Sequence, residues 1–211
     1  MVKKHKGQFI TLEGIEGAGK STHLQFIADL LTNAGKEVVI TREPGGTDLG
    51  EQIRNILLMQ KTLHISNTAE LLLMFAARAQ HLLQVIMPAL EKGQYVLCDR
   101  FTDSTYAYQG GGRNVSMETI GKVAQLVHPG FKPDLTLLFD LPVETGLARA
   151  RSVGEADRFE SETINFFKSA RAVFLEIANS EPQRVKVINA EKDVAAVQTE
   201  IKIILTGMKL C

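Results

Sequence analysis

Five short apolar runs alternate along the chain with longer segments in which apolar positions recur every three or four residues. Each run is almost continuously apolar, as expected for a parallel strand that is covered on both faces. The predicted strands are residues 8–14, 37–43, 95–100, 134–141 and 184–189. Regular alternation of strands with helices predicts right-handed crossovers and one doubly wound α/β sheet.

The segments between and after these runs have a helical period. The predicted helices are residues 21–35, 68–93, 117–127, 162–180 and 191–208. The last one is amphipathic, and its apolar face carries Val194, Val197, Ile201 and Ile204. Two polar stretches rich in glycine or arginine, 42–55 and 148–160, interrupt the pattern. We expect both to be mobile insertions.

Composition narrows the class of protein. The chain has 211 residues, 45% of them hydrophobic and 23% charged, which is the profile of a folded globular domain. Its 24 basic and 24 acidic side chains give a formal net charge of zero. A broad surface for nucleic acid or for an acidic membrane needs an excess of basic residues, so neither partner is expected. Any binding of anions is expected to be local.

The first residues and the cysteines indicate a cytoplasmic protein. The apolar run near the start breaks at Glu13, too early for a signal peptide or a membrane span. Two cysteines, Cys98 and Cys211, cannot form a disulfide framework, and Cys98 lies in an apolar strand where it is expected to be a small core residue. The histidines have no metal-binding spacing, and none is expected to be a ligand.

Residues 14–21, "GIEGAGKS", match the phosphate-loop pattern G-x-x-x-x-G-K-[ST] at every fixed position. A predicted strand precedes the loop and a predicted helix follows it, which is the context that the motif requires. Its glycines let backbone N–H groups surround phosphates beside the positive end of the helix dipole. We therefore predict that a nucleoside triphosphate binds here. The residues expected to hold it are Gly14, Ile15, Glu16, Gly17, Ala18, Gly19, Lys20, Ser21 and Thr22.

The loop also predicts a magnesium site. Lys20 supplies a positive charge for the β- and γ-phosphates, and the Ser21 hydroxyl is placed to ligate Mg²⁺. Asp99 ends an apolar strand, where a carboxylate commonly holds the metal or its water. The alternative, an aspartate that caps a helix, is disfavoured because the phosphate loop already needs a metal partner.

Arginines near strand ends indicate a second anion. Arg42 and Arg100 each come at the end of a predicted strand, so both are expected to project toward the site. Arg113 follows "QGGG", a segment expected to be flexible until it closes over a ligand. The fork of an arginine matches phosphate oxygens bidentately, so several such arginines favour a second phosphorylated ligand.

A switch GTPase is disfavoured. Such a protein needs a guanine-selecting Asn-Lys-x-Asp after a strand, and the sequence has no such tetrapeptide. "DRFT" also stands where a DxxG would follow the metal-binding strand.

Longer motifs are more specific than the phosphate loop. In order, they are "EGIEGAGKST", "TREPGGT", "LLLMFAARAQHL", "DRFTDSTYAYQGGGR", "PDLTLLFDL" and "GLARARSVGEADRFE". Together they closely resemble bacterial thymidylate kinases over essentially the whole chain. The resemblance implies one P-loop domain of the nucleoside-monophosphate-kinase type over 1–211, with five parallel strands covered by helices on both faces. It also implies transfer of the γ-phosphoryl group of MgATP to dTMP, giving dTDP, and a homodimer.

The resemblance further implies roles for individual residues. An acceptor-binding segment near 42–78 and an arginine-rich lid near 146–162 would close on the substrates. The dTMP phosphate would be held by Arg42 and Arg100, and Arg78 would donate to the thymine 4-carbonyl. Thr105 and Gln109 would reach the remaining polar edge of the base, with Ser104 and Tyr108 as weaker candidates. The lid would bring Arg149, Arg151 and Arg158 to the transferring phosphate.

Two positions depart from the family pattern. Four residues before Arg78, where the family usually has a phenylalanine that stacks on thymine, this chain has Met74, with Phe75 beside it. Either Met74 contacts the base through its sulfur or Phe75 turns in, and an ordinary core role for Phe75 is equally open. Second, Val153 stands where related lids often carry another arginine, which leaves open which lid arginine covers the ATP phosphates.

Glu16 is unusual because it places a carboxylate inside a loop that binds polyanions. The resemblance implies that it points away from ATP and accepts a hydrogen bond from the 3′-hydroxyl of dTMP. Two alternatives stay open: a P-loop kinase for another nucleoside monophosphate or a deoxynucleoside, and a nucleotide-binding regulatory protein. A bare nucleoside would not need Arg42, and a pure binder would not need Lys20 and Asp99.

Overall fold

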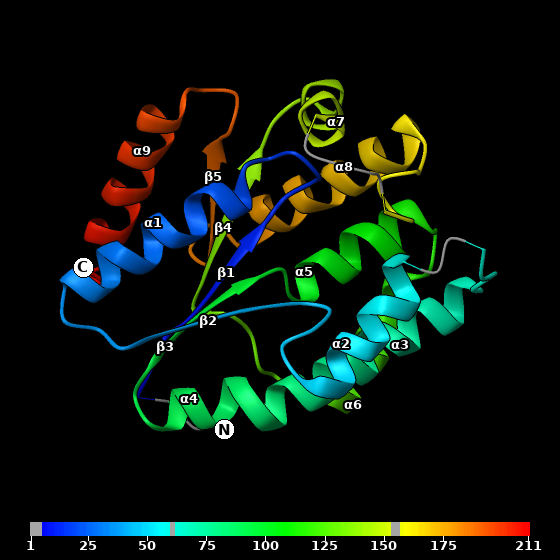
Figure 1. The fold of residues 1–211 in the computed structure, drawn as a ribbon, viewed down its shortest axis with the longest axis horizontal. Helices are drawn as coiled ribbons and strands as arrows, with labels where there is room; N and C mark the ends of the chain where they lie inside the picture. The colour runs from blue at the N-terminus through cyan, green and yellow to red at the C-terminus, as the bar shows by residue number, and fades with distance from the viewer. Residues whose placement is uncertain (1–5, 60–61, 153–156) are drawn as a thin grey trace.

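Five parallel strands form one sheet in the order β2-β3-β1-β4-β5 (Figure 1). The computed structural model describes residues 6–59, 62–152 and 157–211. The strands are β1 (Phe9–Glu13), β2 (Val38–Arg42), β3 (Tyr95–Asp99), β4 (Leu135–Asp140) and β5 (Val185–Asn189). Every predicted strand is confirmed, with ends within about a residue or two, because a buried parallel strand is marked by its apolar run.

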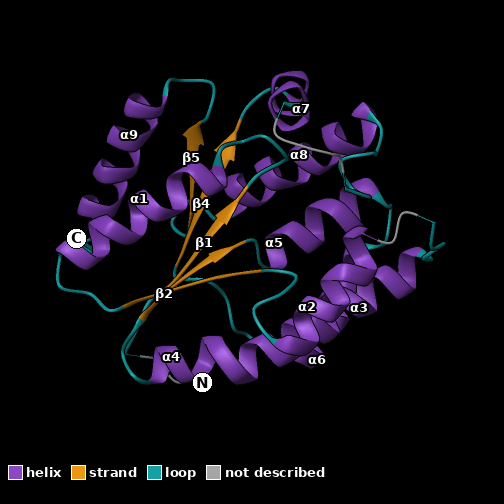
Figure 2. Ribbon diagram, viewed as in Figure 1, coloured by secondary structure: helices purple, strands orange, loops and turns teal. Residues whose placement is uncertain are grey.

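Helices surround the sheet and are coloured purple in Figure 2. They are α1 (Lys20–Asn33), α2 (Asp48–Arg54), α3 (Asn67–His81), α4 (Met87–Glu91), α5 (Thr102–Thr105), α6 (Met117–Val127), α7 (Val143–Arg151), α8 (Ile164–Ser180) and α9 (Val194–Gly207). Within the described residues, π-helical segments η1 (Asn55–Met59), η2 (Leu82–Ile86) and η3 (Tyr106–Gly112) follow α2, α3 and α5 directly.

Both faces of the sheet are covered. Helices α1 and α9 pack on each other and on one face, whereas α4 and α8 pack on the other (Figure 1). The side chains of β1 point alternately toward these two helix layers, and all five of its residues are buried. Cys98, opposite Thr11 in the register, is fully buried, so its predicted core role is confirmed. The predicted doubly wound fold of the P-loop kinase type is therefore confirmed.

The register brings the carboxyl ends of the central strands together. Leu12 of β1 pairs with Asp99 of β3, and Arg42 of β2 pairs with the same aspartate. The phosphate loop leaves β1 one residue after Glu13, at this edge. Parallel strands therefore deliver the loop, the predicted metal ligand and the arginines to a single place, as expected for an open α/β sheet.

Parts of the two expected insertions are helical, as α2 with η1 and as α7, which the sequence analysis did not predict. Of the apolar face expected on α9, Val197 and Ile201 are buried and Ile204 packs against the core, whereas Val194 is 51% exposed and Leu205 is buried in addition. Glycine and arginine within a helix weaken the apolar period on which the prediction depended.

The "QGGG" segment, expected to be flexible, is the π-helical segment η3 and packs along α8. A Cβ on Gly111 would come within 2.8 Å of the backbone oxygen of Ser169, and one on Gly112 would clash with the Phe166 ring. The glycines therefore serve close helix packing, which leaves Arg113 in a fixed position at the end of η3.

Helix Asn67–Glu91, formed by α3, η2 and α4, is long and apolar enough to cross a membrane by length and composition alone. It also carries buried Glu70, Arg78 and His81, and all three of these side chains have hydrogen-bond partners in the protein. These contacts are those of a core helix.

Candidate active site

The phosphate loop connects β1 to α1 in the conformation that its glycines permit. Gly17 and Gly19 have φ of 69° and 85°, values that residues with a Cβ seldom adopt. A Cβ on Gly17 would also collide with the backbone oxygen of Gly146 in α7, so the loop and α7 touch. Gly19 caps α1 without a side-chain hydrogen bond, which leaves N–H groups of the first turn for a ligand.

Lys20 is buried at the first position of α1. Its Nζ donates hydrogen bonds to the backbone oxygens of Gly14, at 3.0 Å, and Ile15, at 2.9 Å. Burial, helped by the nearby charge of Arg100, lowers the pKa of Lys20 to about 8. Ile15 and Ala18 are buried and Ser21 and Thr22 are exposed, as a loop that presents its backbone outward requires.

A cavity of about 230 Å³ opens beside the loop. At one end it is lined by Glu16, Lys20, Ser21, Asp99 and Arg100. Met74, Arg78, Thr105 and Gln109 line the part away from the loop, and Ser104 and Tyr108, which bond Arg100 and Glu16, lie between the two groups. The structure thus brings together most of the side chains that the sequence nominated for two different ligands.

Asp99 and Ser21 lie on the cavity wall where a metal bound to phosphates would sit. Asp99 Oδ1 is buried and has no hydrogen-bond partner among the described residues. A carboxylate oxygen in this state is stabilised by a cation or by its water, so the two residues fit Mg²⁺.

Glu16 lines the cavity and is held by two partners. Arg100 Nη2 donates to its Oε1 at 3.1 Å, and the Tyr108 hydroxyl donates to its Oε2 at 2.7 Å. The Arg100 guanidinium also lies 4.9 Å from the centre of the Tyr108 ring. The carboxylate therefore helps to fix the arginine beside the phosphate loop.

Arg100 has a backbone conformation that is rare outside glycine, with φ of 72°. Its Nη1 donates to the Gly14 oxygen at 3.0 Å and to Ser104 Oγ at 3.1 Å. These bonds direct the guanidinium across the cavity instead of into solvent. Burial opposes its charge, but Tyr108 and the carboxylate of Glu16 are among the groups that outweigh burial and raise its pKa.

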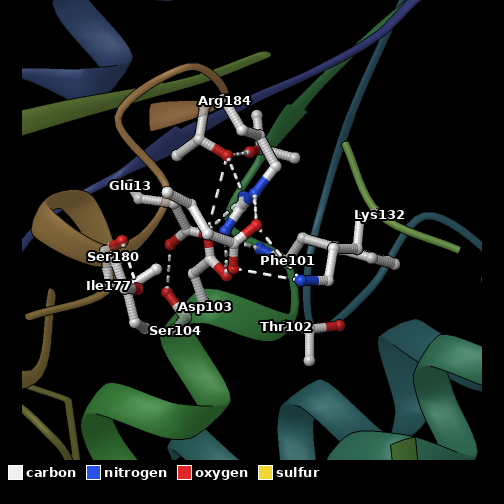
Figure 3. Close-up of polar contacts among 12 residues, drawn as sticks. Glu13, Phe101, Thr102, Asp103, Ser104, Lys132, Ile177, Ser180 and Arg184 are labelled. Atoms are coloured by element: carbon white, nitrogen blue, oxygen red, sulfur yellow. Dashed lines mark hydrogen bonds and ion pairs between the residues drawn. The ribbon is translucent and has the colours of Figure 1, made fainter. Parts of the chain in front are cut away.

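Glu13 holds the residues that follow Arg100 in the chain, Phe101 and Ser104 (Figure 3). It accepts hydrogen bonds from the Phe101 backbone N–H at 2.7 Å and from Ser104 Oγ at 2.6 Å. Burial, with the charge of Asp103 nearby, raises the pKa of Glu13 to about 8. Near neutral pH, Glu13 is therefore largely a neutral acid that anchors the start of α5.

Glu13 predicts a pH dependence of stability. Because its folded pKa, about 8, exceeds the ordinary value of 4.5, the folded state holds the extra proton between these values. Its contribution to the free energy of unfolding is therefore full below pH 4.5 and is lost as pH rises toward 8, by at most about 1.4 kcal/mol per pH unit. We expect Glu13→Gln to flatten this slope in urea unfolding between pH 5 and 8. Glu118→Gln, at an exposed position, is the control; equal slopes in both variants would contradict this role.

An ion pair between Arg184 and Asp103 also holds α5 in place. Arg184 donates to both oxygens of Asp103, at 2.7 and 3.1 Å, and to Thr136 Oγ1 at 2.8 Å (Figure 3). Asp103 is thereby tied to strand β4. Ser104 and Thr105, the next two residues, consequently reach the cavity from a rigid turn.

Arg78 is buried at the far end of the cavity and is oriented by a chain of polar groups. Its Nε donates to Glu43 Oε2 at 2.7 Å, and its Nη2 donates to Thr105 Oγ1 at 3.0 Å. The other oxygen of Glu43 bonds His81, which bonds Thr41. Arg78 Nη1 is buried without a hydrogen-bond partner among the described residues. A buried guanidinium N–H of this kind needs an acceptor, which a ligand or a water molecule in the cavity can supply.

Glu70 forms a second buried centre on the same helix. It accepts hydrogen bonds from Gln109 Nε2 at 2.9 Å and from Arg113 Nε at 3.2 Å, and it also pairs with Arg158 Nη2. Glu70 was not among the residues nominated from the sequence. Glu70, Met74 and Arg78 follow one another at intervals of four residues, which places them on the same face of a helix. This spacing is the signal that could have revealed Glu70.

Met74, not Phe75, lines the cavity. Phe75 is 2% exposed and packs with Leu71 and Ile120 in the core between α3 and α6. The expectation that Phe75 turns in toward a base is therefore wrong for this structure, and the core alternative holds. Both side chains neighbour Arg78 on the helix, Phe75 at a spacing of three residues and Met74 at a spacing of four. The Arg78 guanidinium lies 4.8 Å from the centre of the Phe75 ring, which belongs to the core, whereas Met74 lines the cavity.

Arg42 does not project into the cavity. Its side chain is 54% exposed and donates to Glu51 Oε2 at 3.0 Å. Arg54, which the sequence analysis missed, lines the cavity instead and donates to the backbone oxygen of Pro44 at 2.9 Å. Burial, followed by the charge of Arg42, lowers the pKa of Arg54. Arg54 was missed because it lies in α2, a helix that the sequence analysis did not predict.

The arginines of the predicted lid lie outside the cavity wall. Arg149 donates at 2.8 Å to a backbone oxygen just beyond β5, Arg151 is exposed, and Arg158 pairs with Glu70. They approach no common point, so the expected grouping at a phosphate is not present in this structure. Val153 lies outside the described residues.

The comparisons identify similar proteins. A family model described as thymidylate kinase matches residues 12–201. A thymidylate kinase of Pseudomonas putida (strain GB-1) is 54% identical over 202 residues, which cover 96% of each chain. One of Hahella chejuensis (strain KCTC 2396) is 53% identical over 196 residues, covering 93% of this chain and 94% of that one. A crystal structure of thymidylate kinase from Ehrlichia chaffeensis matches with a TM-score of 0.77 and 34% identity, covering 95% of this chain and 98% of that chain.

Proposed function

The chain belongs to the thymidylate kinase family, and we propose that dTMP meets ATP in the cavity between its phosphate loop and α3. The family gives the reaction: the protein transfers a phosphoryl group from ATP to dTMP and forms dTDP for nucleotide biosynthesis. One observation carries the placement of dTMP, namely the buried and unpaired Nη1 of Arg78 at the cavity.

The thymine base lies against α3. Arg78 Nη1 donates to the thymine 4-carbonyl, an acceptor that cytosine replaces with an amino donor. Met74 covers the face of the base with its polarisable sulfur, as its place on the cavity wall supports. Thr105 already accepts a hydrogen bond from Arg78, so it steadies the guanidinium beside the base.

The phosphate of dTMP lies near Arg100. This side chain is fixed by Glu16 and Gly14 at the end of the cavity that adjoins the phosphate loop. Arg54 lies on the same wall and supplies a second guanidinium. Arg42 remains a candidate that would have to leave Glu51 to reach the phosphate. Glu16 accepts a hydrogen bond from the 3′-hydroxyl, an interaction that would replace one of its present contacts.

The transfer needs positioning more than covalent chemistry. An oxygen of the dTMP phosphate attacks the γ-phosphorus of ATP, the bond to the bridging oxygen breaks, and ADP leaves. Lys20 moves its Nζ from the backbone oxygens of Gly14 and Ile15 to the phosphates. Arg100 neutralises charge between the two nucleotides, where repulsion is greatest.

Magnesium is the metal that suits these residues. Asp99 and Ser21 would hold it, supported by the unpaired Oδ1 of Asp99. Among the described residues there is no group of three metal-ligating side chains, which fits an ion held mainly by phosphates and water. When bound, Mg²⁺ neutralises phosphate charge.

The segment near 146–162 acts as the lid in this proposal. Arg149 lies close to the end of β5, and Arg151 is free to turn toward ATP from its exposed position. Arg158 would have to leave Glu70 to reach the transferring phosphate, so its present contacts favour a structural role. The segment near 42–78 closes on dTMP as part of the same domain.

A coupled phosphotransfer assay tests this function. With MgATP present, we expect rapid phosphorylation of dTMP and much slower phosphorylation of dCMP and dGMP. A regulatory nucleotide-binding protein would give no turnover, and a kinase for another nucleotide would leave dTMP untouched. Either result would contradict the proposal.

Arg78→Lys tests the placement of the base. Lysine keeps a positive charge for Glu43 but loses the rigid fork that also reaches Thr105 and the 4-carbonyl. We expect kcat/KM for dTMP to fall about 10–100-fold, mostly through KM, with KM for ATP unchanged. Unchanged kinetics with dTMP would place the base elsewhere.

We further propose a cytoplasmic homodimer. Helices α3 and α6 pack together, and the exposed apolar side chains Leu72 on α3, Leu83 on η2 and Leu126 on α6 leave apolar surface for a second copy. Cys98 and Cys211 are free thiols, which suits a reducing compartment. Sedimentation at micromolar concentration should give twice the mass of the chain, and a single-chain mass would contradict the dimer.

A further inference from the structure

We propose that Glu70 is a positioning residue for base selectivity, because it fixes the Gln109 amide so that the amide oxygen accepts the N3–H of thymine. The inference rests on the proposed placement of dTMP. It assigns a task to a buried carboxylate that the transfer reaction itself does not use.

Glu70 is fully buried on α3, and three side chains donate hydrogen bonds to its carboxylate. Gln109 and Arg113 donate to its Oε1, and Arg158 pairs with its Oε2. A guanidinium can only donate, and the two arginines place N–H groups at both oxygens of Glu70, so each oxygen acts as an acceptor. The side of the Gln109 amide that faces Glu70 must therefore be its NH₂ group.

The position of the oxygen of Gln109 follows from that constraint. An amide whose nitrogen is held by Glu70 turns its oxygen the other way, and Gln109 lies on the cavity wall. The bond that fixes the amide uses its nitrogen and leaves its oxygen for another partner. Gln109 is 1% exposed, so its amide does not rotate freely in water. The cavity thus contains a fixed acceptor from η3.

Together with Arg78, this acceptor gives the cavity a hydrogen-bonding polarity. Arg78 Nη1 presents a donor without a partner and Gln109 Oε1 presents an acceptor. Thymine and uracil offer the complementary pair, a 4-carbonyl acceptor and an N3–H donor. Cytosine offers the reverse at both atoms. Glu43 fixes the donor through Arg78 Nε, and Glu70 fixes the acceptor through Gln109.

A purely structural role for Glu70 would be to neutralise Arg113 and Arg158. That role predicts a loss of stability, or a loss of affinity that is the same for every base. Positioning of Gln109 predicts a loss that depends on the hydrogen-bonding edge of the base. The two roles are separated by comparing dTMP, dUMP and dCMP, since dTMP and dUMP share this edge and differ only in the methyl group.

Glu70→Gln is the direct test, with Kd for the three nucleotides measured by calorimetry on the full chain. The new amide keeps its oxygen toward Arg158, the partner with the shorter contact, and turns its NH₂ group toward Gln109 and Arg113. The 3.2 Å bond from Arg113 Nε is lost, and Gln109 flips and presents NH₂ to the cavity. We expect the preference for dTMP over dCMP to fall roughly 10–100-fold. The preference for dTMP over dUMP should stay unchanged.

Gln109→Met removes the acceptor and leaves Glu70 with both arginines, so it also decides the matter if Glu70→Gln does not fold. We expect it to lose a similar share of the preference for dTMP over dCMP. In the Gln109→Met background, Glu70→Gln should reduce that preference no further, because Glu70 acts through Gln109.

Two results would overturn the inference. One is a native preference for dTMP over dCMP in Glu70→Gln, and the other is a native preference in Gln109→Met. If the native protein phosphorylates dTMP while either result is obtained, only this inference fails. If the native protein does not phosphorylate dTMP, the proposed function fails first.

Discussion

Replacing Arg100 with alanine is expected to lower kcat for dTMP phosphorylation by about 10³-fold and to change KM for ATP less than about tenfold. Arg100 is held by Gly14, Ser104 and Glu16 beside the phosphate loop. In our proposal its positive charge lies where the two phosphates approach each other. Charge at that point stabilises the transition state more than it stabilises bound ATP.

Steady-state kinetics with both substrates varied measure this effect. Arg171→Ala is the matched control, because Arg171 also forms a close ion pair, with Asp140, but does not line the cavity. The control should retain kcat within a few fold. Near-normal turnover by Arg100→Ala would show that the acceptor phosphate does not bind where we place it.

The second large effect is expected from Lys20→Ala, which should impair both ATP binding and turnover. Lys20 is buried and bonds only backbone oxygens of the loop, so the phosphates are its natural partners. We expect kcat to fall about 10²–10³-fold and ATP affinity to fall at least about tenfold. Calorimetric titration with ATP separates binding from turnover. ATP affinity equal to that of the native protein would contradict the assignment.

Lys20 also predicts how activity depends on pH. Its pKa is lowered to about 8, mainly by burial, so in the free protein the charge is present below pH 8 and is lost above it. We expect kcat/KM for ATP to decline above pH 8, whereas kcat at saturating ATP should hold to higher pH because bound phosphates favour the charged amine. A flat profile of kcat/KM to pH 9.5 would contradict this.

The sheet could be predicted from the sequence because its strands are buried on both faces. In β1 even Thr11 and Glu13 are fully buried, and the apolar residues around them kept the run recognisable. Helices α2 and α7 were missed because their glycines and arginines resemble loop sequence. In η3 the glycines serve contact with α8, a tertiary reason that no local pattern contains.

The candidate site also has a part that the sequence predicted and a part that only the structure shows. The phosphate loop and Asp99 were found because their chemistry is local to a motif or to a strand end. The partners that orient the cavity side chains, such as Glu43 for Arg78 and Glu70 for Gln109, were not found. Each of these pairs joins residues at least 35 positions apart, so only the folded chain brings them together.

Glu16 illustrates the difference. The sequence indicated that a carboxylate in the phosphate loop must serve something other than ATP. The structure adds that Arg100 and Tyr108 hold both of its oxygens. Glu16 thus orients the arginine beside the phosphates and is also available, in our proposal, to the sugar of dTMP.

A crystal structure with dTMP bound tests the central claim most directly. We predict the thymine 4-carbonyl at Arg78 Nη1, the base against Met74, and the phosphate at Arg100. The native contact of Arg78 with Glu43 should persist. A bound dTMP whose base lies away from Arg78, or whose phosphate contacts neither Arg100 nor Arg54, would contradict the account.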